Sequence, residues 1–326
     1  MQKMSTPLTA RRQSLDHSIR LVHFRRRRRN RRDWHRVDGR GPGVTERPEL
    51  HLLPAEQIVA RLLDAEQRVI PAVRAASGQI VAAAQLIADR LRAGGRLAFA
   101  GAGTSGRVAF TEAAELPGTF GLAGERVVAI MAGGIDVADS HEDDMDMAHH
   151  DLSRLAPAPG DVLVAVAASG TTPYTVELAR GAARAGTDVV AVVNTSGSLL
   201  AQVAHLAIEV PIGPEVLRGS TRLSAGSAQK IALNALTTTA MTLLGRVHGD
   251  VMVDVVPANA KLRERAAGIV AEVAATSLDD ARAALSACDG NTRAAILYLV
   301  GRLPPREAAE RAAAYATLQA ALNSIR

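Results

Sequence analysis

Short, almost continuously apolar runs alternate with longer amphipathic stretches through the middle of the chain. Five such runs span residues 97–100, 127–131, 162–168, 189–193 and 206–210. Strands buried on both faces of a parallel sheet have this character, and the stretches between most of the runs are long enough for a crossover helix. The pattern therefore predicts a doubly wound α/β layer, with a five-stranded parallel sheet flanked by helices.

Helical periodicity brackets the predicted sheet on both sides. Before it, apolar positions recur at a helical spacing over residues 55–75 and 79–93, and the second stretch ends at Gly94-Gly95. After it, no further strand is predicted, and a long apolar helix is expected over residues 228–247. More helices are expected, several with Ser, Thr or Asp near their starts, over residues 258–274, 277–287, 291–302 and 305–323.

These patterns divide the chain into three parts. We expect a basic, disordered tail over residues 1–44 and a sheet domain with its N-terminal helices over residues 45–257. A small helical module follows over residues 258–326. Pro304-Pro305 separates the last two helices of this module, because proline is not tolerated in a helix interior.

The formal net charge of +5 is unevenly distributed along the chain. Residues 1–43 hold 13 basic and 3 acidic residues, a balance of +10, which leaves 25 basic and 30 acidic residues, a balance of −5, for the remainder. The arginine cluster at residues 25–32, beside Phe24 and Trp34, is compatible with nucleic-acid contacts. A solvated arm or an overextended gene start is the simpler explanation, because nothing else in the chain has a matching basic face. Nucleic acid is therefore not an expected partner.

Composition also bears on the compartment of the protein. Cys288 is the only cysteine, so no disulfide can form within the chain. No apolar run reaches the roughly 18 residues that span a bilayer, and charges interrupt the stretch where a signal peptide would have its apolar core. We expect a soluble cytoplasmic protein without membrane contact.

Two segments rich in glycine and hydroxyl groups follow predicted strands. The first is Gly101-Ala102-Gly103-Thr104-Ser105-Gly106-Arg107, and the second is Ala168-Ser169-Gly170-Thr171-Thr172-Pro173. Ligands of open α/β sheets bind beyond the carboxyl ends of the strands, where glycines admit an anion and a helix N-terminus offers N–H groups. The first segment lacks the lysine of a P-loop, which favours a small phosphate monoester over a nucleotide. For either loop taken alone, a tight turn without a ligand is the alternative.

Acidic residues form a second group of candidates. Glu112 and Glu115 lie three residues apart on the helix expected after the first loop, and we place Glu115 at the end of that helix, before Pro117. Glu142 follows the second predicted strand in an acidic stretch with neighbouring histidines. If Glu115 and Glu142 share a pocket with the phosphate loops, they form a general acid and base pair. A solvated acidic loop is the alternative for residues 143–146, and no recognised ligand spacing indicates a metal site.

A polar stretch, residues 213–222, precedes the long apolar helix, in which Gln229, Lys230 and Asn234 are conspicuous. Buried polar groups need partners, so a capping and interface network explains these residues as well as substrate binding does. The same side chains are able to serve both purposes.

An ordered series of motifs occupies residues 101–107, 115–121, 132–134, 142–144, 167–174, 213–230 and 252–262. This series resembles the N-acetylmuramic acid 6-phosphate etherase family from about residue 45 to the C-terminus. The resemblance implies a sugar isomerase (SIS) fold and a cytoplasmic homodimer that needs no metal or organic cofactor. It also implies cleavage of the D-lactyl ether of a small sugar phosphate, N-acetylmuramate 6-phosphate, in cell-wall recycling. The products would be N-acetylglucosamine 6-phosphate and D-lactate.

The motif positions imply roles for individual residues. By resemblance, Glu115 is the acid that protonates departing lactate and then activates water, and Glu142 is the base that removes the C2 proton. The residues implied to bind the substrate or its phosphate are Gly103, Thr104, Ser105, Arg107, Ser169, Thr171, Thr172, Glu215, Ser220, Thr221 and Lys230.

The chain departs from the family pattern around these positions. The loop after Gly134 is shorter, and residues 138–141 replace the usual E-G-A-E-D before the second acid. Thr171 and Ser224 stand where the family has arginine and lysine, and Glu112 stands where it has aspartate. The alternatives are another SIS-fold isomerase or lyase acting on a related amino-sugar phosphate, and a sugar-phosphate sensor without catalysis.

Overall fold

The computed structural model describes residues 49–135 and 141–325. The basic tail, the start of the predicted sheet domain at residues 45–48 and the segment 138–140 lie outside the described residues. From Leu50 onward the chain forms one compact unit. The predicted boundary between residues 257 and 258 stays a prediction.

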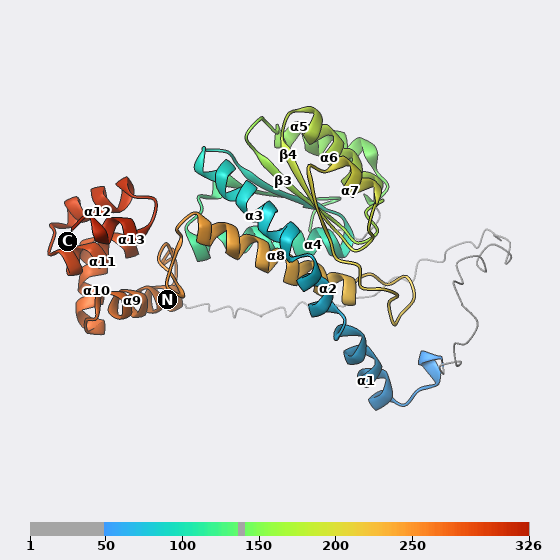
Figure 1. Ribbon diagram of the computed structural model, residues 1–326, viewed down its shortest axis with the longest axis horizontal. Helices are drawn as coiled ribbons and strands as arrows, with labels where there is room; N and C mark the ends of the chain where they lie inside the picture. Colours follow the sequence, from blue (N-terminus) through green and yellow to red (C-terminus); the bar gives the residue numbers. More distant parts are fainter. Residues whose placement is uncertain (1–48, 136–140, 326) are drawn as a thin grey trace, which may run out of the picture. The chain divides into compact units, whose positions relative to one another are not determined.

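A five-stranded parallel sheet forms the centre of this unit (Figure 1). The strand order is β2-β1-β3-β4-β5, so β1 lies between β2 and β3. All residues of β1 and β3 are buried, as the continuous apolar runs require. The predicted five-stranded doubly wound sheet is confirmed, and its strands are β1 Leu97–Gly101, β2 Val127–Met131, β3 Val162–Ala167, β4 Asp188–Val193 and β5 Leu206–Glu209.

Helices cover both faces of the sheet. Because side chains of a strand alternate between faces, Phe99 and Val164 point into one core and Ala98 and Leu163 into the other. The first core includes buried residues of α3 Ser77–Arg92, α4 Gly103–Phe120 and α8 Ser224–Leu243. The second is formed with α5 Met145–Leu155, α6 Pro173–Arg184 and α7 Leu199–Val203, on the opposite side of the sheet in Figure 1.

The N-terminal helical region contains more breaks than the sequence predicts. The expected helix over residues 55–75 is two helices, α1 Ala55–Glu66 and α2 Val69–Ala75, which a turn at residues 67–68 separates. The apolar spacing continues through the turn, so it hides the break. Val69 and Val73 of α2 are buried in the main core, whereas Ala65 is the buried residue of α1. A short 3-10 helix, Leu50–Leu52, precedes α1.

The C-terminal helices have a hydrophobic core of their own. They are α9 Ala260–Ala274, α10 Leu278–Ala287, α11 Thr292–Gly301, α12 Pro305–Ala314 and α13 Leu318–Asn323. The helix predicted over residues 305–323 is thus two helices, and Thr317 caps the second. Ser277 caps α10, as predicted for a polar start, whereas α9 and α11 are capped by Asn259 and Asn291, a residue type that the prediction did not include.

A small hairpin, β6 Val247–His248 and β7 Val251–Met252, lies between α8 and α9. The prediction that no strand follows the sheet was therefore wrong. Two-residue strands are too short to leave an alternating pattern in the sequence. The predicted helix over residues 228–247 accordingly ends earlier, at Leu243.

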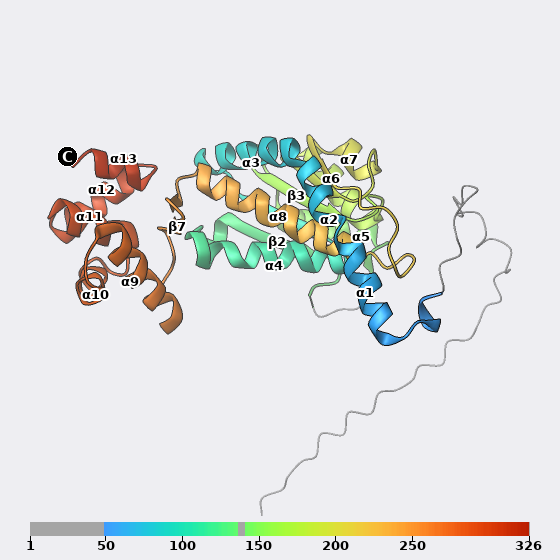
Figure 2. The same cartoon turned by 60° about the horizontal axis from the view of Figure 1, so that its bottom comes forward.

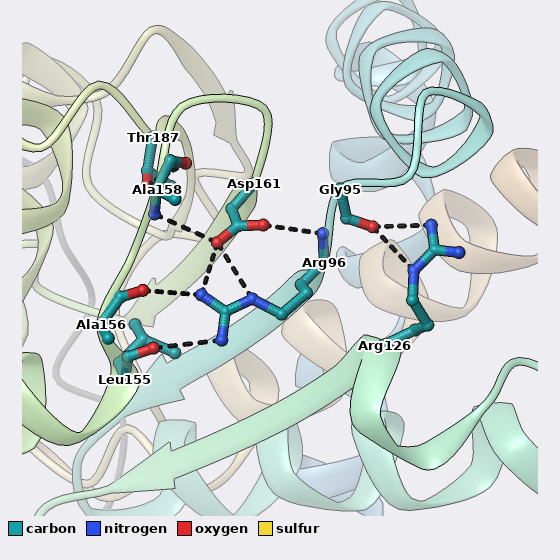
Figure 3. Close-up of polar contacts among 8 residues, drawn as sticks. All are labelled: Gly95, Arg96, Arg126, Leu155, Ala156, Ala158, Asp161 and Thr187. Carbon is teal, nitrogen blue, oxygen red and sulfur yellow. Dashed lines mark hydrogen bonds and ion pairs between the residues drawn. The ribbon is translucent and has the colours of Figure 1, made fainter.

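Arginines tie the amino ends of the central strands together, opposite the ends where ligands bind (Figure 3). Nη2 of Arg96, just before β1, lies 2.6 Å from Oδ2 of Asp161, just before β3, and the Arg96 backbone N–H donates to Oδ1 at 2.8 Å. Nε of Arg126, just before β2, donates to the carbonyl of Gly95 at 3.0 Å. A Cβ at Gly95 would collide with the carbonyl of Gly160, so this close approach requires glycine.

Replacing Asp161 with asparagine is expected to lower the free energy of unfolding by about 3 kcal/mol at neutral pH, because Arg96 would lose a buried partner. Burial alone would raise the pKa of Asp161, but the hydrogen bonds from Arg96 and Ala158 outweigh burial and lower it. A lowered pKa stabilises the fold above the ordinary value of 3.8, and this contribution is lost as the pH falls through the folded-state value.

Urea unfolding at neutral and acidic pH checks this prediction. The difference in the free energy of unfolding between the wild type and Asp161→Asn should become smaller at acidic pH. A difference that does not change with pH would contradict the stabilising role of the Asp161 carboxylate. The control is Asp89→Asn, whose side chain is 72% exposed beside Arg92. A change of less than about 1 kcal/mol is expected for this exposed pair.

In the described part of the chain, no single helix has the length and apolar character needed to cross a membrane. Two neighbouring segments, Ala55–Ala75 and Ser77–Arg92, satisfy both criteria only when they are combined, and they are bent by 59°.

Candidate functional site

The segments that follow β1, β2 and β3 meet at the carboxyl edge of the sheet. Gly101 at the end of β1 pairs with Met131 of β2 on one side and Val166 of β3 on the other. The backbone N–H of Ala132 also donates to the carbonyl of Gly101 at 3.2 Å. The strand order therefore makes neighbours of the two hydroxyl loops and the acidic loop.

The glycines of the first loop allow α4 to start directly on the end of β1. Gly103 has a φ of 53°, a conformation that favours glycine. A Cβ at Gly101 would lie 2.9 Å from the backbone nitrogen of Gly106, and a Cβ at Gly106 would lie 2.8 Å from the carbonyl oxygen of Gly101. Thr104 and Ser105 thus lie in the first turn of α4, where a helix has N–H groups without intrahelical partners.

The second loop has the same plan at the start of α6. Ser169 Oγ accepts hydrogen bonds from the backbone N–H of Thr171 at 3.2 Å and from its hydroxyl at 3.0 Å. Thr172 is the N-cap residue, and Pro173 occupies the first turn, as predicted. Gly170 has a φ of 64°, and a Cβ there would collide with Ser198. Both loops therefore present hydroxyl groups beside a helix N-terminus.

The backbone of Glu142 is fixed next to the second hydroxyl loop. Its carbonyl accepts a hydrogen bond from the backbone N–H of Tyr174 at 3.1 Å, two residues after Thr172. Asp144 caps α5 through Met147 N–H at 2.8 Å, and this bond holds the pKa of Asp144 below its usual value. The acidic loop therefore combines the capping role of Asp144 with the placement of Glu142 near the expected phosphate site.

A buried pair holds α5 against α6 behind this loop. The Tyr174 hydroxyl donates to Oδ2 of Asp151 at 2.7 Å, and both residues are buried. Burial, followed by the nearby Asp151 carboxylate, strongly raises the pKa of Tyr174. Tyr174 thus contacts Glu142 through its backbone and Asp151 through its hydroxyl.

Glu115 lies elsewhere on α4. It was predicted at the end of the helix, but α4 continues through Pro117 to Phe120 and ends at Gly121, whose φ is 62°. The prediction was wrong because Pro117 is accommodated inside the helix instead of ending it. Glu115 lies ten residues beyond Ser105, which corresponds to about 15 Å between the Cα atoms. Its side chain is 59% exposed.

Glu115 joins an ion cluster between α4 and α8, which run side by side (Figure 2). Nζ of Lys230 lies 3.0 Å from Oε2 of Glu115 and 2.6 Å from Oε2 of Glu112. The Thr237 hydroxyl donates to the other oxygen of Glu112. Partial burial would lower the pKa of Lys230, but its bonds to the two carboxylates outweigh burial and raise it. Lys230 is therefore held as an ammonium by two carboxylates.

The polar stretch before α8 contains both capping and site contacts. Glu215 accepts from the backbone N–H groups of Ser224 and Ala225, at 3.2 and 2.9 Å, so its carboxylate stabilises the start of α8. A Cβ at Gly226 would lie 3.4 Å from Thr104 and 3.7 Å from the Thr221 carbonyl. Gly226 therefore lies close both to Thr104 of the first hydroxyl loop and to Thr221 of the polar stretch.

The remaining candidates lie close to these segments. Arg107 follows Gly106 on α4, and its carbonyl accepts from the Thr111 hydroxyl. The backbone N–H of Ser220 donates to the Leu217 carbonyl within a turn of the polar stretch. The structure thus brings the phosphate-loop candidates, Thr221 and the backbone of Glu142 to one edge, while Glu115 and Lys230 lie farther along α4 and α8.

A cavity of about 520 Å³ lies along β2 and is lined by residues of β2, by α5 and by His141. Its lining includes neither Glu115 nor the hydroxyls of the two loops. The condition that Glu115 and Glu142 share one pocket with the phosphate loops is therefore not met by this cavity.

Two polar residues near the site, Asn194 and Glu112, have no role predicted from the sequence. Asn194 follows β4 directly, accepts from Gln229 Nε2 at 3.0 Å and donates to the Val210 carbonyl. Its place after a strand was the available indication. Glu112 was noticed for its spacing and for standing where the family has aspartate, but its burial depends on Lys230 and Thr237, more than a hundred residues away.

Among residues 49–135 and 141–325, no three or more His, Cys, Asp or Glu side chains are arranged to hold a metal ion. The expectation that no cofactor is needed stays a prediction.

Comparisons with solved structures give matches of limited extent. A phosphoheptose isomerase from Neisseria gonorrhoeae matches 57% of this chain and 98% of its own, with 20% identity and a TM-score of 0.45. A phosphoheptose isomerase from Francisella tularensis matches 57% of this chain and 97% of its own, with 18% identity and a TM-score of 0.43.

Sequence comparison extends over nearly the whole chain. The SIS domain family matches residues 63–194. An N-acetylmuramic acid 6-phosphate etherase from Rubrobacter xylanophilus is 42% identical over 88% of this chain and 98% of its own length. Its namesake from Deinococcus radiodurans is 41% identical over 81% of this chain and 88% of its own. The chain therefore belongs to the N-acetylmuramic acid 6-phosphate etherase family.

Proposed function

We propose that this protein is a carbon–oxygen lyase that cleaves the D-lactyl ether of N-acetylmuramate 6-phosphate, releasing D-lactate and N-acetylglucosamine 6-phosphate. The observation that carries the proposal is the 42% identity to a relative of that name over 98% of its length. The two hydroxyl loops on neighbouring strands support it, because they suit a phosphate monoester.

The phosphate is proposed to bind between the first turns of α4 and α6. Thr104 and Ser105 supply hydroxyls from one helix start, and Ser169 and Thr172 supply them from the other. The helix N-termini add N–H groups and a favourable dipole for a dianion. Thr171, which bonds to Ser169 in this structure, orients that hydroxyl.

The proposed reaction is an elimination followed by hydration. In the open-chain sugar the C1 aldehyde acidifies the C2 proton, which the Glu142 carboxylate removes. The C3–O bond then breaks, a C2–C3 double bond forms, and Glu115 transfers a proton to the departing lactyl oxygen. Glu115, now a carboxylate, activates water for addition to C3, and a proton returns to C2. The sequence is redox-neutral and consumes one water molecule.

We further propose that the protein acts in the cytoplasm as a homodimer, in cell-wall sugar recycling. The distance between Glu115 and the first loop supports the dimer. About 15 Å separates the Cα atoms of Glu115 and Ser105 along α4, and the Glu115 side chain pairs with Lys230 of α8 and not with the loop. The exposed Glu115 of one chain is therefore proposed to act with the phosphate loops and Glu142 of a second copy.

Mixing two inactive variants checks this arrangement. Glu115→Gln and Glu142→Gln chains, unfolded together and refolded, should recover about a quarter of wild-type lactate release, because half of the dimers are mixed and each restores one of two sites. Each variant refolded alone is the control. No recovery in a mixture shown to contain mixed dimers would contradict a shared site.

The function itself is tested by incubating the full chain with N-acetylmuramate 6-phosphate and measuring D-lactate with a lactate dehydrogenase. One molecule each of D-lactate and N-acetylglucosamine 6-phosphate is expected for every molecule of substrate consumed. Interconversion of other amino-sugar phosphates without lactate release would favour an isomerase. Saturable binding without turnover would favour a sensor.

A further inference from the structure

Glu112 is a buried carboxylate that the proposed reaction does not use. Only 3% of its surface is exposed, and it lies on α4 where this helix packs against α8. A buried carboxylate is costly unless it is paired and hydrogen-bonded. Here Lys230 Nζ lies 2.6 Å from one oxygen, and the Thr237 hydroxyl donates to the other.

The partners of Glu112 connect the core to Glu115. Glu112 and Glu115 are three residues apart and therefore share one face of α4. Lys230 reaches both from α8, with Nζ 3.0 Å from Glu115. Glu115 is 59% exposed, so its long side chain would otherwise be free to sample several rotamers. A continuous series of contacts thus runs from buried Thr237, through Glu112 and Lys230, to the exposed Glu115.

The cluster places the ammonium of Lys230 between two glutamate side chains. With Glu115 alone, the ammonium of Lys230 would have a single partner on an exposed side chain. Glu112 gives Lys230 a second and closer partner, so the positive charge is shared. The charged groups that act on Lys230 are these two glutamates, both from α4.

We propose that Glu112 is a positioning residue for lactate departure, which anchors Lys230 so that the carboxyl group of Glu115 is held in place for proton transfer. This inference rests on the proposed function and adds a residue to it. Glu112 lies too deep to touch the substrate and acts through Lys230. Its role is separate from phosphate binding and from removal of the C2 proton.

The test compares two readouts in Glu112→Gln, which keeps the shape of the side chain and removes its charge. Lactate release is expected to fall by about tenfold or more in kcat, with little change in KM, because the loss occurs after binding. Exchange of the C2 proton with deuterated water should continue at a wild-type rate, because removal of this proton by Glu142 precedes the proton transfer from Glu115. Glu112→Asp, which restores the charge and matches the family pattern, should recover most of the lost release.

A second variant of the cluster and a control variant test the same inference. Thr237→Val removes the second partner of Glu112 and should reproduce part of the loss with exchange intact. Glu264→Gln breaks an exposed ion pair with Arg282, 2.7 Å long, and should change neither readout.

Wild-type lactate release in Glu112→Gln would overturn the inference. An equal fall of release and exchange would also overturn it, since that result indicates a merely structural role. No lactate release by the wild-type chain would instead overturn the proposed function, and the role of Glu112 with it.

Discussion

Replacing Glu115 with glutamine is expected to lower D-lactate release by about 100- to 10,000-fold, the range that a general acid and base contributes. Glutamine fills the same space and keeps one hydrogen-bond acceptor for Lys230, but it has no acidic proton to give to the departing lactyl oxygen. The C2 proton should still exchange with deuterated water, because its removal precedes the step that is blocked. Proton NMR at C2 and a lactate assay measure the two steps in one sample.

A control with similar exposure keeps this result interpretable. Glu310 is 65% exposed and pairs with Arg306 at 2.9 Å, far along the chain from the site. Glu310→Gln should release lactate at the wild-type rate. Near-normal lactate release by Glu115→Gln would remove Glu115 from the mechanism.

Replacing Glu142 with glutamine is expected to abolish both lactate release and C2 exchange. The amide cannot accept the proton, and elimination cannot begin until the proton is removed. The carbonyl of Glu142 would still accept from the Tyr174 N–H, so the loop should keep its place beside α6. A loss of about 100-fold or more in both rates is expected, with substrate binding retained.

The two variants together decide which carboxylate has which role. Exchange that survives in Glu115→Gln and disappears in Glu142→Gln supports the assignment proposed above. The opposite result, with exchange lost in Glu115→Gln and full in Glu142→Gln, would reverse the acid and the base. Asp143→Asn is a suitable neighbour control, because Asp143 is exposed beside Glu142.

The sheet could be predicted from the sequence because its strands are strongly patterned. The runs at 162–168 and 189–193 are short and continuously apolar, as is typical of strands in a parallel sheet that is covered on both faces. The hairpin at residues 247–252 could not be predicted, because two-residue strands leave no periodicity. The break between α1 and α2 was hidden because the apolar spacing continues through the turn.

The site could be predicted only as far as local sequence determines it. The hydroxyl loops are local, since each combines a strand end, glycines and a helix start within a few residues. The ion cluster of Glu112, Lys230 and Glu115 is not local, because Lys230 lies 118 and 115 positions from the two glutamates in the chain. The same holds for the bond between Glu142 and Tyr174, which forms only when α6 packs beside the acidic loop.

The central claim is that this chain cleaves the ether of N-acetylmuramate 6-phosphate by elimination and hydration. The most direct measurement is mass spectrometry of both products after turnover in water enriched in ¹⁸O. Elimination followed by hydration leaves the original ether oxygen in D-lactate and places ¹⁸O in the new C3 hydroxyl of N-acetylglucosamine 6-phosphate. Absence of D-lactate, or ¹⁸O in the lactate hydroxyl with none at C3 of the sugar, would contradict it.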